Sequence, residues 1–118
     1  MCDYITKFKK CSLATRLADS KRLRNKYKDR CCIIVGKNNN SDIPDIERHK
    51  FLVPNSLTIG QFIYIIRQRI ECKPSQALFI FVNGKIPPTS QRLIHVYEAN
   101  KEEDGFLYVT YTGENTFG

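Results

Sequence analysis

The sequence predicts an α+β domain, in which a small sheet is covered by one long helix and preceded by a helical extension. Three observations predict this class. Short apolar runs rich in β-branched and aromatic residues occur at 31–35, 78–82 and 106–111, as is typical of strands. Between the first two runs lies a longer segment whose apolar residues recur at helical spacing. The N-terminal part contains neither glycine nor proline and also indicates helix.

Length and composition are those of one globular domain. The chain has 118 residues, of which 42% are hydrophobic and 26% charged, and this size supports a core without disulfides or metal. No apolar run approaches the roughly 18 residues that cross a bilayer. The first residues lack the apolar stretch of a signal peptide. We therefore expect a cytoplasmic protein whose membrane attachment, if it has one, is peripheral or covalent.

The net charge of +7 is concentrated at the N-terminus. Residues 1–30 contain ten Lys or Arg and three Asp, whereas residues 31–118 contain nine basic and nine acidic residues. A basic segment of this kind attracts acidic protein surfaces, anionic lipid or nucleic acid. For any single residue in it, a solvated helix face is an equally good explanation.

The first helix is predicted over residues 12–28. Ser12 is a suitable N-cap, and apolar residues follow it at Leu13 and Leu17. The β-branched run 31–35 predicts a strand, and residues 36–44 predict a loop. A second short strand is predicted over 50–54, where it ends at a proline.

The clearest helix begins at residue 58. Thr58 and Gln61 have the spacing of a capping box. The apolar residues that follow have the i, i+3, i+4, i+7, i+11 spacing of one helix face. They are Ile59, Phe62, Ile63, Ile66 and Ile70.

The second half of the chain predicts two more strands. The almost uninterrupted apolar run 78–82 is best explained as a central strand covered on both faces. Asn83-Gly84 predicts a turn, residues 89–100 a weaker helix, and Asp104-Gly105 another turn. A last strand is predicted over 106–111.

From residue 31 onward the predicted order is strand, strand, long helix, strand, short helix, strand. This is the ubiquitin-like β-grasp plan, with an N-terminal helical extension in front of it. We accordingly divide the chain into the extension at 1–28, the β-grasp domain at 29–111 and a flexible C-terminal tail at 112–118. The tail has too little apolar content to pack.

No pattern typical of an enzyme or a metal site occurs in the sequence. The five cysteines have no C-x-x-C spacing, and the adjacent Cys31 and Cys32 suit neither an ordinary disulfide nor a tetrahedral zinc site. His49 and His95 have no ligand-like spacing, and no phosphate-binding loop is present. We therefore predict reduced thiols and a protein that is not an enzyme, with no catalytic residue, metal or cofactor.

Three stretches carry a resemblance to a known family. They are Ser41-Asp-Ile-Pro-Asp45, the segment from Lys50-Phe-Leu-Val-Pro54 through Gly60-Gln-Phe62, and Gly105-Phe-Leu-Tyr-Val-Thr-Tyr-Thr-Gly-Glu-Asn-Thr-Phe-Gly118. From about residue 12 onward the sequence resembles the autophagy-related ubiquitin-like modifiers, the family of GABA type A receptor-associated proteins and microtubule-associated protein light chains. Residues 1–11 match poorly, which leaves any membrane-tethering or tubulin-binding role of that segment open.

The resemblance implies conjugation through a C-terminal glycine to phosphatidylethanolamine on autophagosomal membranes. Gly118 would be the conjugated residue, and Thr116 and Phe117 would be read by a processing cysteine protease. Activating and conjugating enzymes of the ubiquitin-like pathway would be further partners. A glycine suits this chemistry because it has no Cβ, so its carboxylate enters narrow active sites.

The resemblance also implies a groove beside the second strand that binds cargo receptors carrying a short aromatic-x-x-aliphatic motif, by strand addition. Arg30, Lys50 and Arg69 would meet acidic residues near the motif. The pocket for the aromatic side chain would be lined by Asp19, Leu23, Cys32, Ile34, Lys50, Leu52 and Phe106. The pocket for the aliphatic side chain would be lined by Phe51, Val53, Pro54, Leu57, Phe62 and Ile65.

Strand alternation supports this division, because Lys50 and Leu52 should face one way and Phe51 and Val53 the other. Lys50 stands among apolar neighbours, which indicates an external partner for its charge. Several of the other residues are equally well explained as plain core. Cys32 stands where the family usually has proline, so it restores a backbone N–H and alters the floor of the aromatic pocket.

Other functions remain open at this level. An unconjugated peptide-binding adaptor would use the same groove without lipid. A microtubule-associated adaptor would use the basic N-terminal segment, with tubulin as its partner. Nucleic acid is not favoured, because only Tyr4, Phe8 and Tyr27 are interleaved with that charge.

Overall fold

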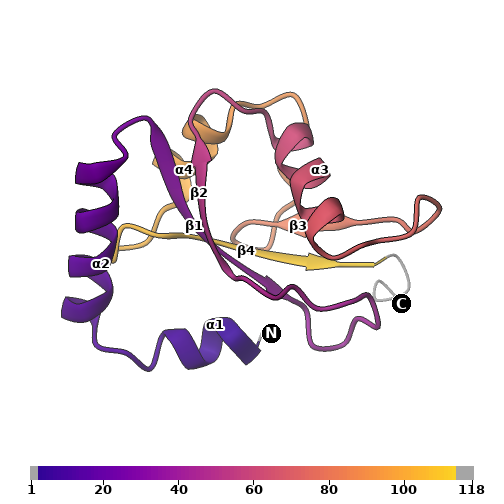
Figure 1. Cartoon of the computed structure of the whole chain (residues 1–118), viewed down its shortest axis with the longest axis horizontal. Coiled ribbons are helices and arrows are strands. Elements are labelled where there is room, and N and C mark those ends of the chain that lie inside the picture. Colours follow the sequence, from indigo (N-terminus) through magenta and orange to yellow (C-terminus); the bar gives the residue numbers. More distant parts are fainter. Residues whose placement is uncertain (1–2, 114–118) are drawn as a thin grey trace.

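The computed structural model describes residues 3–113 and has the predicted α+β arrangement, a mixed sheet with helices on both faces (Figure 1). The strand order is β2-β1-β4-β3, with β1 parallel to β4 and the other pairs antiparallel. The strands are β1 Arg30–Lys37, β2 Lys50–Pro54, β3 Phe79–Phe81 and β4 Leu107–Thr112. The helices are α1 Asp3–Phe8, α2 Leu13–Lys26, α3 Ile59–Arg69 and α4 Leu93–Asn100.

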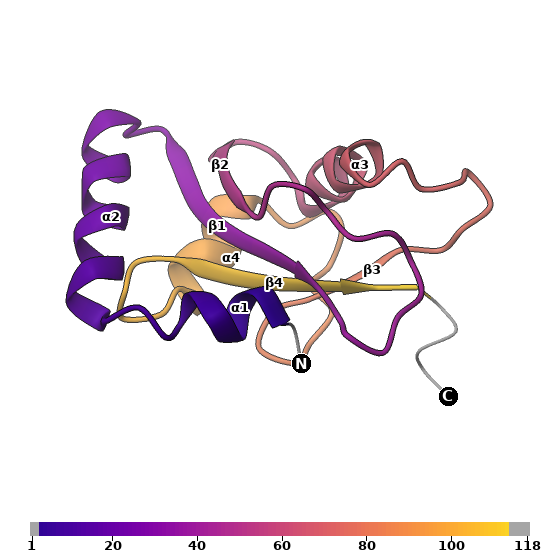
Figure 2. The ribbon, with the colours of Figure 1, turned by 60° about the horizontal axis from the view of Figure 1, so that its bottom comes forward.

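Strand β1 is the centre of the fold. Its residues 31–36 are all buried, because side chains on both faces of the strand are covered. Cys31, Ile33 and Val35 belong to the main core, together with buried residues of α3 and α4. Cys32 and Ile34 point to the opposite face, where α1 and α2 lie (Figure 2). There they form a second group of buried residues, here called the minor cluster, which consists of Leu23, Cys32, Ile34 and Phe106.

The two long helices begin where the sequence predicts. Ser12 Oγ accepts the Thr15 N–H at the start of α2. Thr58 and Gln61 form the predicted capping box of α3, with both reciprocal bonds present. Three residues of the predicted apolar face of α3, Ile59, Phe62 and Ile66, are buried against the sheet.

The prediction of a central strand at 78–82 was wrong. Only residues 79–81 form a strand, and this strand, β3, is an edge of the sheet that pairs with β4 alone. Ile80 is buried, whereas Phe79 and Phe81 on the other face are only partly buried. The aromatic side chains of Phe79 and Phe81 on this second face remain partly exposed, so the apolar run does not correspond to a strand covered on both faces. The central positions belong to β1 and β4.

Two boundaries also differ from the sequence-based prediction. Strand β1 continues through Gly36 and Lys37, which pair with β4 and were predicted as loop. Thr112 and Gly113, assigned above to the tail, are buried. Thr112 pairs with Phe79, and the Gly113 N–H donates to Ser41 Oγ at 3.0 Å. Thr112 and Gly113 make these bonds with their backbone groups. The apolar content of the tail therefore gave no indication of them.

A buried carboxylate joins the helical extension to the sheet. The side chain of Asp104 is fully buried and forms a 2.6 Å ion pair with Arg16 of α2. It also accepts the Phe106 N–H at 2.9 Å and the Tyr108 hydroxyl. The Asp104 carbonyl accepts the hydroxyl of Ser20 from the same helix. A buried carboxylate is stable only when it is paired and hydrogen-bonded, and all of these partners are supplied.

We expect Asp104→Asn to lower the free energy of unfolding by about 3 kcal/mol, because it leaves the Arg16 guanidinium without a counter-charge in a partly buried position. Chemical denaturation monitored by circular dichroism measures the loss. The neighbouring Glu103→Gln removes the same charge from an exposed side chain, and we expect a change below about 0.5 kcal/mol. Equal losses in the two variants would contradict the assigned role of the Asp104 ion pair.

Candidate functional site

The outer edge of β2 has no neighbouring strand among residues 3–113. β2 pairs only with β1. The Val35 N–H donates to the His49 carbonyl across 2.7 Å. Because bonded and non-bonded pairs alternate in antiparallel strands, the N–H and C=O groups of Lys50 and Leu52 point away from β1. Such a row of outward groups is what an extended peptide requires to add a strand to a sheet.

The side chains of β2 divide between the two faces of the sheet, as the alternation predicts. Phe51 and Val53 are buried in the main core, where Phe51 packs edge-on against Phe62. Leu52 is partly buried and packs against the minor cluster on the opposite face. The Lys50 ammonium lies 5.9 Å from the ring centre of Phe106 on that same face.

The residues of the predicted aromatic pocket come together on this face. Four of them, Leu23, Cys32, Ile34 and Phe106, are the minor cluster itself. They come from α2, β1 and the turn before β4, so only the tertiary fold unites them. Leu52 packs against them, and Lys50 and Asp19 form an ion pair beside them.

The residues of the predicted pocket are covered by α1, which the sequence did not predict. The ring of Phe8 meets Phe106 edge-on with centroids 5.5 Å apart, and it lies 5.8 Å from the Lys50 ammonium. Tyr4 stacks on both Phe8 and His49. The signal was present in the sequence, because Tyr4, Ile5 and Phe8 share one helix face at i, i+1 and i+4.

The cover consists of partly buried side chains, Tyr4, Ile5 and Phe8, which pack on the minor cluster. No residue of α1 is fully buried. The backbone N–H of Asp3 donates to Asn39 Oδ1 at 3.0 Å, and Lys9 beyond the helix pairs with Glu102 at 2.9 Å. A six-residue helix has little stability of its own. The physical arrangement is therefore a short helix that covers the minor cluster, with the Phe8 ring against Phe106.

The ion pair between Lys50 and Asp19 forms the rim of the pocket. Burial by itself would raise the pKa of the Asp19 carboxyl, but the hydrogen bonds from Lys50 and Arg22 outweigh it and hold the pKa below its usual value. The positive charge predicted to await an external partner is thus partly neutralised within the protein.

The predicted aliphatic pocket has a buried half and an accessible half. Phe51, Val53 and Phe62 belong to the main core. Pro54, Leu57 and Ile65 are only partly buried. Leu57 and Ile65 line a cleft of about 530 Å³ that also includes Tyr64 of α3. The accessible half is therefore the part that an incoming aliphatic side chain could touch.

The two predicted charge contacts differ in their placement. Arg30 is exposed, and its guanidinium donates to the Leu52 carbonyl at 3.2 Å, which is one of the outward groups of the β2 edge. Arg69 is exposed in the last turn of α3. Arg30 is thus at the groove, and a peptide that takes the Leu52 carbonyl would have to displace it.

Comparisons with known proteins agree with this architecture. The sequence profile of the family described as "Autophagy protein Atg8 ubiquitin like" matches residues 15–118. The chain belongs to this family. Autophagy-related protein 8B of rice, Oryza sativa, is 54% identical over 107 residues, which are 91% of this chain and 90% of that protein. Autophagy-related protein 8a of Arabidopsis thaliana is 51% identical over 106 residues, covering 90% and 87%.

A solved structure extends the likeness to the fold. The crystal structure of Trypanosoma brucei ATG8 superposes with a TM-score of 0.87 at 40% sequence identity, covering 92% of this chain and 94% of that one. The α+β fold described above is therefore the ubiquitin-like fold of the Atg8 family. The family profile begins at residue 15, so α1 with Phe8 lies before the matched stretch.

Three predicted site residues lie outside the described residues. Thr116, Phe117 and Gly118 fall within the stretch that matches the Atg8 family, but the structure does not describe them. Among residues 3–113, no helix is long and apolar enough to cross a membrane. Within the same range, no group of three or more His, Cys, Asp or Glu side chains is placed to hold a metal ion.

We expect Lys50→Met to raise the pKa of the Asp19 carboxyl, because the substitution removes a cation that opposes the effect of burial. Since the folded-state pKa of Asp19 is depressed, the pair contributes stability at neutral pH that is lost as the pH falls through that pKa. An NMR titration of the Asp19 side-chain carboxyl measures this pKa in the unaltered chain and in Lys50→Met. Lys101→Met, which removes a lysine paired with Glu98 instead, should leave the Asp19 titration unchanged. An unaltered Asp19 pKa in Lys50→Met would contradict the assigned pair.

Proposed function

We propose that this chain is a ubiquitin-like modifier, conjugated through Gly118 to phosphatidylethanolamine on autophagosomal membranes, which recruits cargo receptors through the groove at β2. It would be cytoplasmic before conjugation and membrane-bound afterwards. The observation that carries the proposal is membership of the Atg8 family, with a match that runs through residue 118. The outward backbone groups of β2 support the second half of it.

Conjugation requires partners that supply the chemistry. A cysteine protease that reads Thr116 and Phe117 would prepare the terminus, and activating and conjugating enzymes would carry the Gly118 carboxyl to the lipid amine. A glycine at this position offers no Cβ to obstruct those active sites. In this proposal the chain is the group transferred and contributes no catalytic residue.

Peptide docking would use the geometry of β2. A motif of the form aromatic-x-x-aliphatic would pair with the outward N–H and C=O groups of Lys50 and Leu52. Its aromatic side chain would enter the minor cluster, and its aliphatic side chain would lie on Leu57 and Ile65. Acidic residues beside the motif would pair with Lys50, Arg30 and Arg69.

Three groups of the protein would have to move for this docking. Phe8 covers the aromatic pocket, Asp19 holds Lys50, and Arg30 holds the Leu52 carbonyl. A binding site that is closed for part of the time has an apparent affinity reduced by the fraction of the competent state. We therefore propose that α1 lowers the affinity of the groove and that acidic flanks compensate by engaging Lys50 and Arg30.

We expect that deleting Gly118, or replacing it in Gly118→Ala, abolishes or strongly reduces attachment to phosphatidylethanolamine while the fold is retained. The deletion removes the carboxyl that would be conjugated, and the alanine adds a Cβ beside it. The core described above lies within residues 3–113, so neither change should affect it. Incubation with activating and conjugating enzymes and vesicles, followed by mass spectrometry, measures the attachment, and a thermal melt measures the fold.

Gly60→Ala is the matched control. An added Cβ at Gly60 would lie 3.4 Å from the Thr89 carbonyl oxygen, an ordinary contact, and alanine is favoured within a helix. This variant should be conjugated as well as the unaltered chain. A Gly118 deletion variant that still became attached to lipid would refute the proposed conjugation site.

We expect a peptide with an aromatic-x-x-aliphatic motif and acidic flanks to bind, and Leu52→Ala to weaken it by roughly tenfold, or about 1.4 kcal/mol. Phe8→Ala should strengthen binding by about threefold, because it opens the aromatic pocket. Isothermal titration calorimetry measures both changes, which have opposite signs.

Ile86→Ala is the control for this pair. Ile86 is an exposed aliphatic residue that follows β3, the strand at the opposite edge of the sheet from β2. Its truncation should leave the peptide affinity unchanged. Equal losses in Ile86→Ala and Leu52→Ala would place the peptide elsewhere, and weaker binding by Phe8→Ala would mean that α1 is a wall of the pocket and not its cover.

A further inference from the structure

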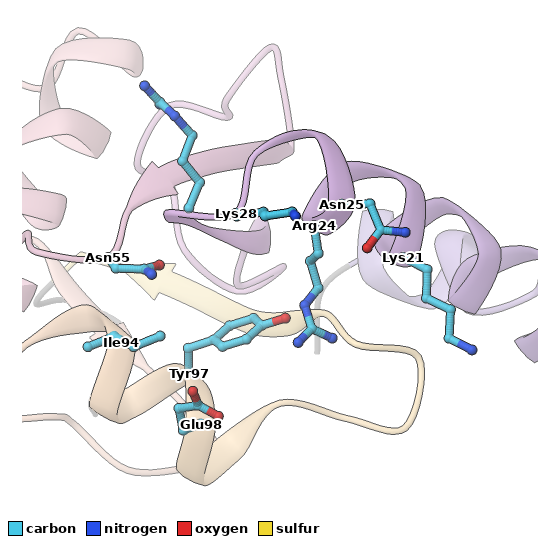
Figure 3. A pocket seen from close by; sticks show the side chains of 9 residues that line it. Lys21, Arg24, Asn25, Lys28, Asn55, Ile94, Tyr97 and Glu98 are labelled. Atoms are coloured by element: carbon cyan, nitrogen blue, oxygen red, sulfur yellow. The ribbon is translucent and has the colours of Figure 1, made fainter.

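A second concave site lies away from the peptide groove. It is a cleft of about 490 Å³ between the second half of α2, the start of β1 and α4 (Figure 3). Strand β4 pairs with β1 only from Ile33 onward, so the first residues of β1 have a neighbouring strand on the β2 side but not on the β4 side. Side chains of the two helices border this region, and Tyr97 of α4 lies between them.

The lining of this cleft is strongly basic. Lys21, Arg24 and Lys28 line it from α2 and its C-terminal end, and among residues 3–113 none of the three forms an ion pair. Arg24 faces the Tyr97 ring at 5.9 Å. The acidic residue in the lining is Glu98, which is paired with Lys101 at 3.3 Å.

The remaining lining is suited to hydrogen bonding more than to apolar contact. Asn25 and Asn55 contribute amide groups, and Ile94 is the aliphatic side chain of the set. The Cys31 thiol donates to the side-chain oxygen Oδ1 of Asn55 at 3.2 Å, which leaves the side-chain NH₂ group of Asn55 as a donor. Arg30 contributes to the lining, but its guanidinium is bound to the Leu52 carbonyl at the groove. Arg30 therefore borders both the cleft and the groove, whereas Lys21, Arg24 and Lys28 line the cleft.

We propose that this cleft binds the phosphate groups of a small polyanion, such as a phosphorylated inositol. The volume lies in the range of small-molecule sites. A phosphate monoester carries up to two negative charges and three acceptor oxygens, which matches two ammonium groups and one guanidinium better than a single peptide carboxylate does. The same chemistry occurs in a soluble inositol phosphate and in the headgroup of a phosphoinositide lipid.

The first test uses the full unconjugated chain and inositol trisphosphate as the probe, with calorimetry for affinity and amide NMR for location. We expect the amide chemical shifts to change in the second half of α2, at Asn55 and in α4. The double variant Lys21→Gln, Lys28→Gln should bind at least about tenfold more weakly, because two charge-assisted contacts are lost. Both lysines are exposed and take no part in the core.

The matched control removes two charges from the same basic segment. Lys7 and Lys10 are exposed and do not line the cleft, so Lys7→Gln, Lys10→Gln should bind within about twofold of the unaltered chain, as long-range attraction is screened by salt. Glu98→Gln should bind several-fold more tightly, because it removes the negative charge from the lining. A damaged fold would not raise the affinity, so a gain in Glu98→Gln shows that the charge of the lining, and not a change of fold, determines binding.

The second test identifies the source of the phosphate. Vesicles of phosphatidylcholine are compared with vesicles that also contain phosphatidylinositol bisphosphate. Binding to the second vesicles that is weakened by Lys21→Gln, Lys28→Gln assigns the site to a lipid headgroup. Binding of the soluble probe alone, with the same variant dependence, assigns it to a free polyanion. Absence of both, or equal loss in the Lys7 and Lys10 control, would overturn the proposal.

Discussion

The buried ion pair between Asp104 and Arg16 is the constraint on which the rest of the molecule depends. It joins α2 to the turn before β4, and the hydroxyl of Ser20 adds a second bond between the same two elements. Gly105 follows with φ 83°, a conformation that favours glycine, and a Cβ there would collide with the Ser20 hydroxyl. The helix is thus held against the sheet by buried polar groups, and moving it away would leave the Asp104 carboxylate without its counter-charge.

Both candidate sites use α2 as a wall, so both rely on that attachment. On one side, Leu23 of α2 completes the minor cluster below the predicted aromatic pocket. On another, Lys21 and Arg24 of the same helix line the basic cleft. The helical extension is therefore a structural part of both sites, and three of its basic residues, Lys21, Arg24 and Lys28, line the cleft. Lys50 lies at the groove and Lys21, Arg24 and Lys28 line the cleft, whereas Arg30 borders both, so the two sites share one of their cations.

Local signals in the sequence predicted the regular elements well, because their causes are local. The capping box at Thr58 and the N-cap at Ser12 are made by residues three apart. The turn at Asn83 and Gly84 has positive φ at both residues, as this dipeptide predicts. The error at 78–82 has a different cause. An apolar run indicates that side chains are removed from water, but it does not indicate which neighbours cover them. For this reason an edge strand was predicted at the centre of the sheet.

What the sequence by itself determined is the α+β class, the starts of α2 and α3, the alternation of side chains along β2 and the membership of the chain in the Atg8 family. These follow from short-range periodicity and from long matching stretches. What only the tertiary structure decided is that Phe8 packs over the minor cluster, that Asp19 forms an ion pair with Lys50, and that α2 and α4 border a basic cleft. Each of these contacts joins residues far apart in the chain, and the packing of one element on another, which no local pattern encodes, determines whether they meet.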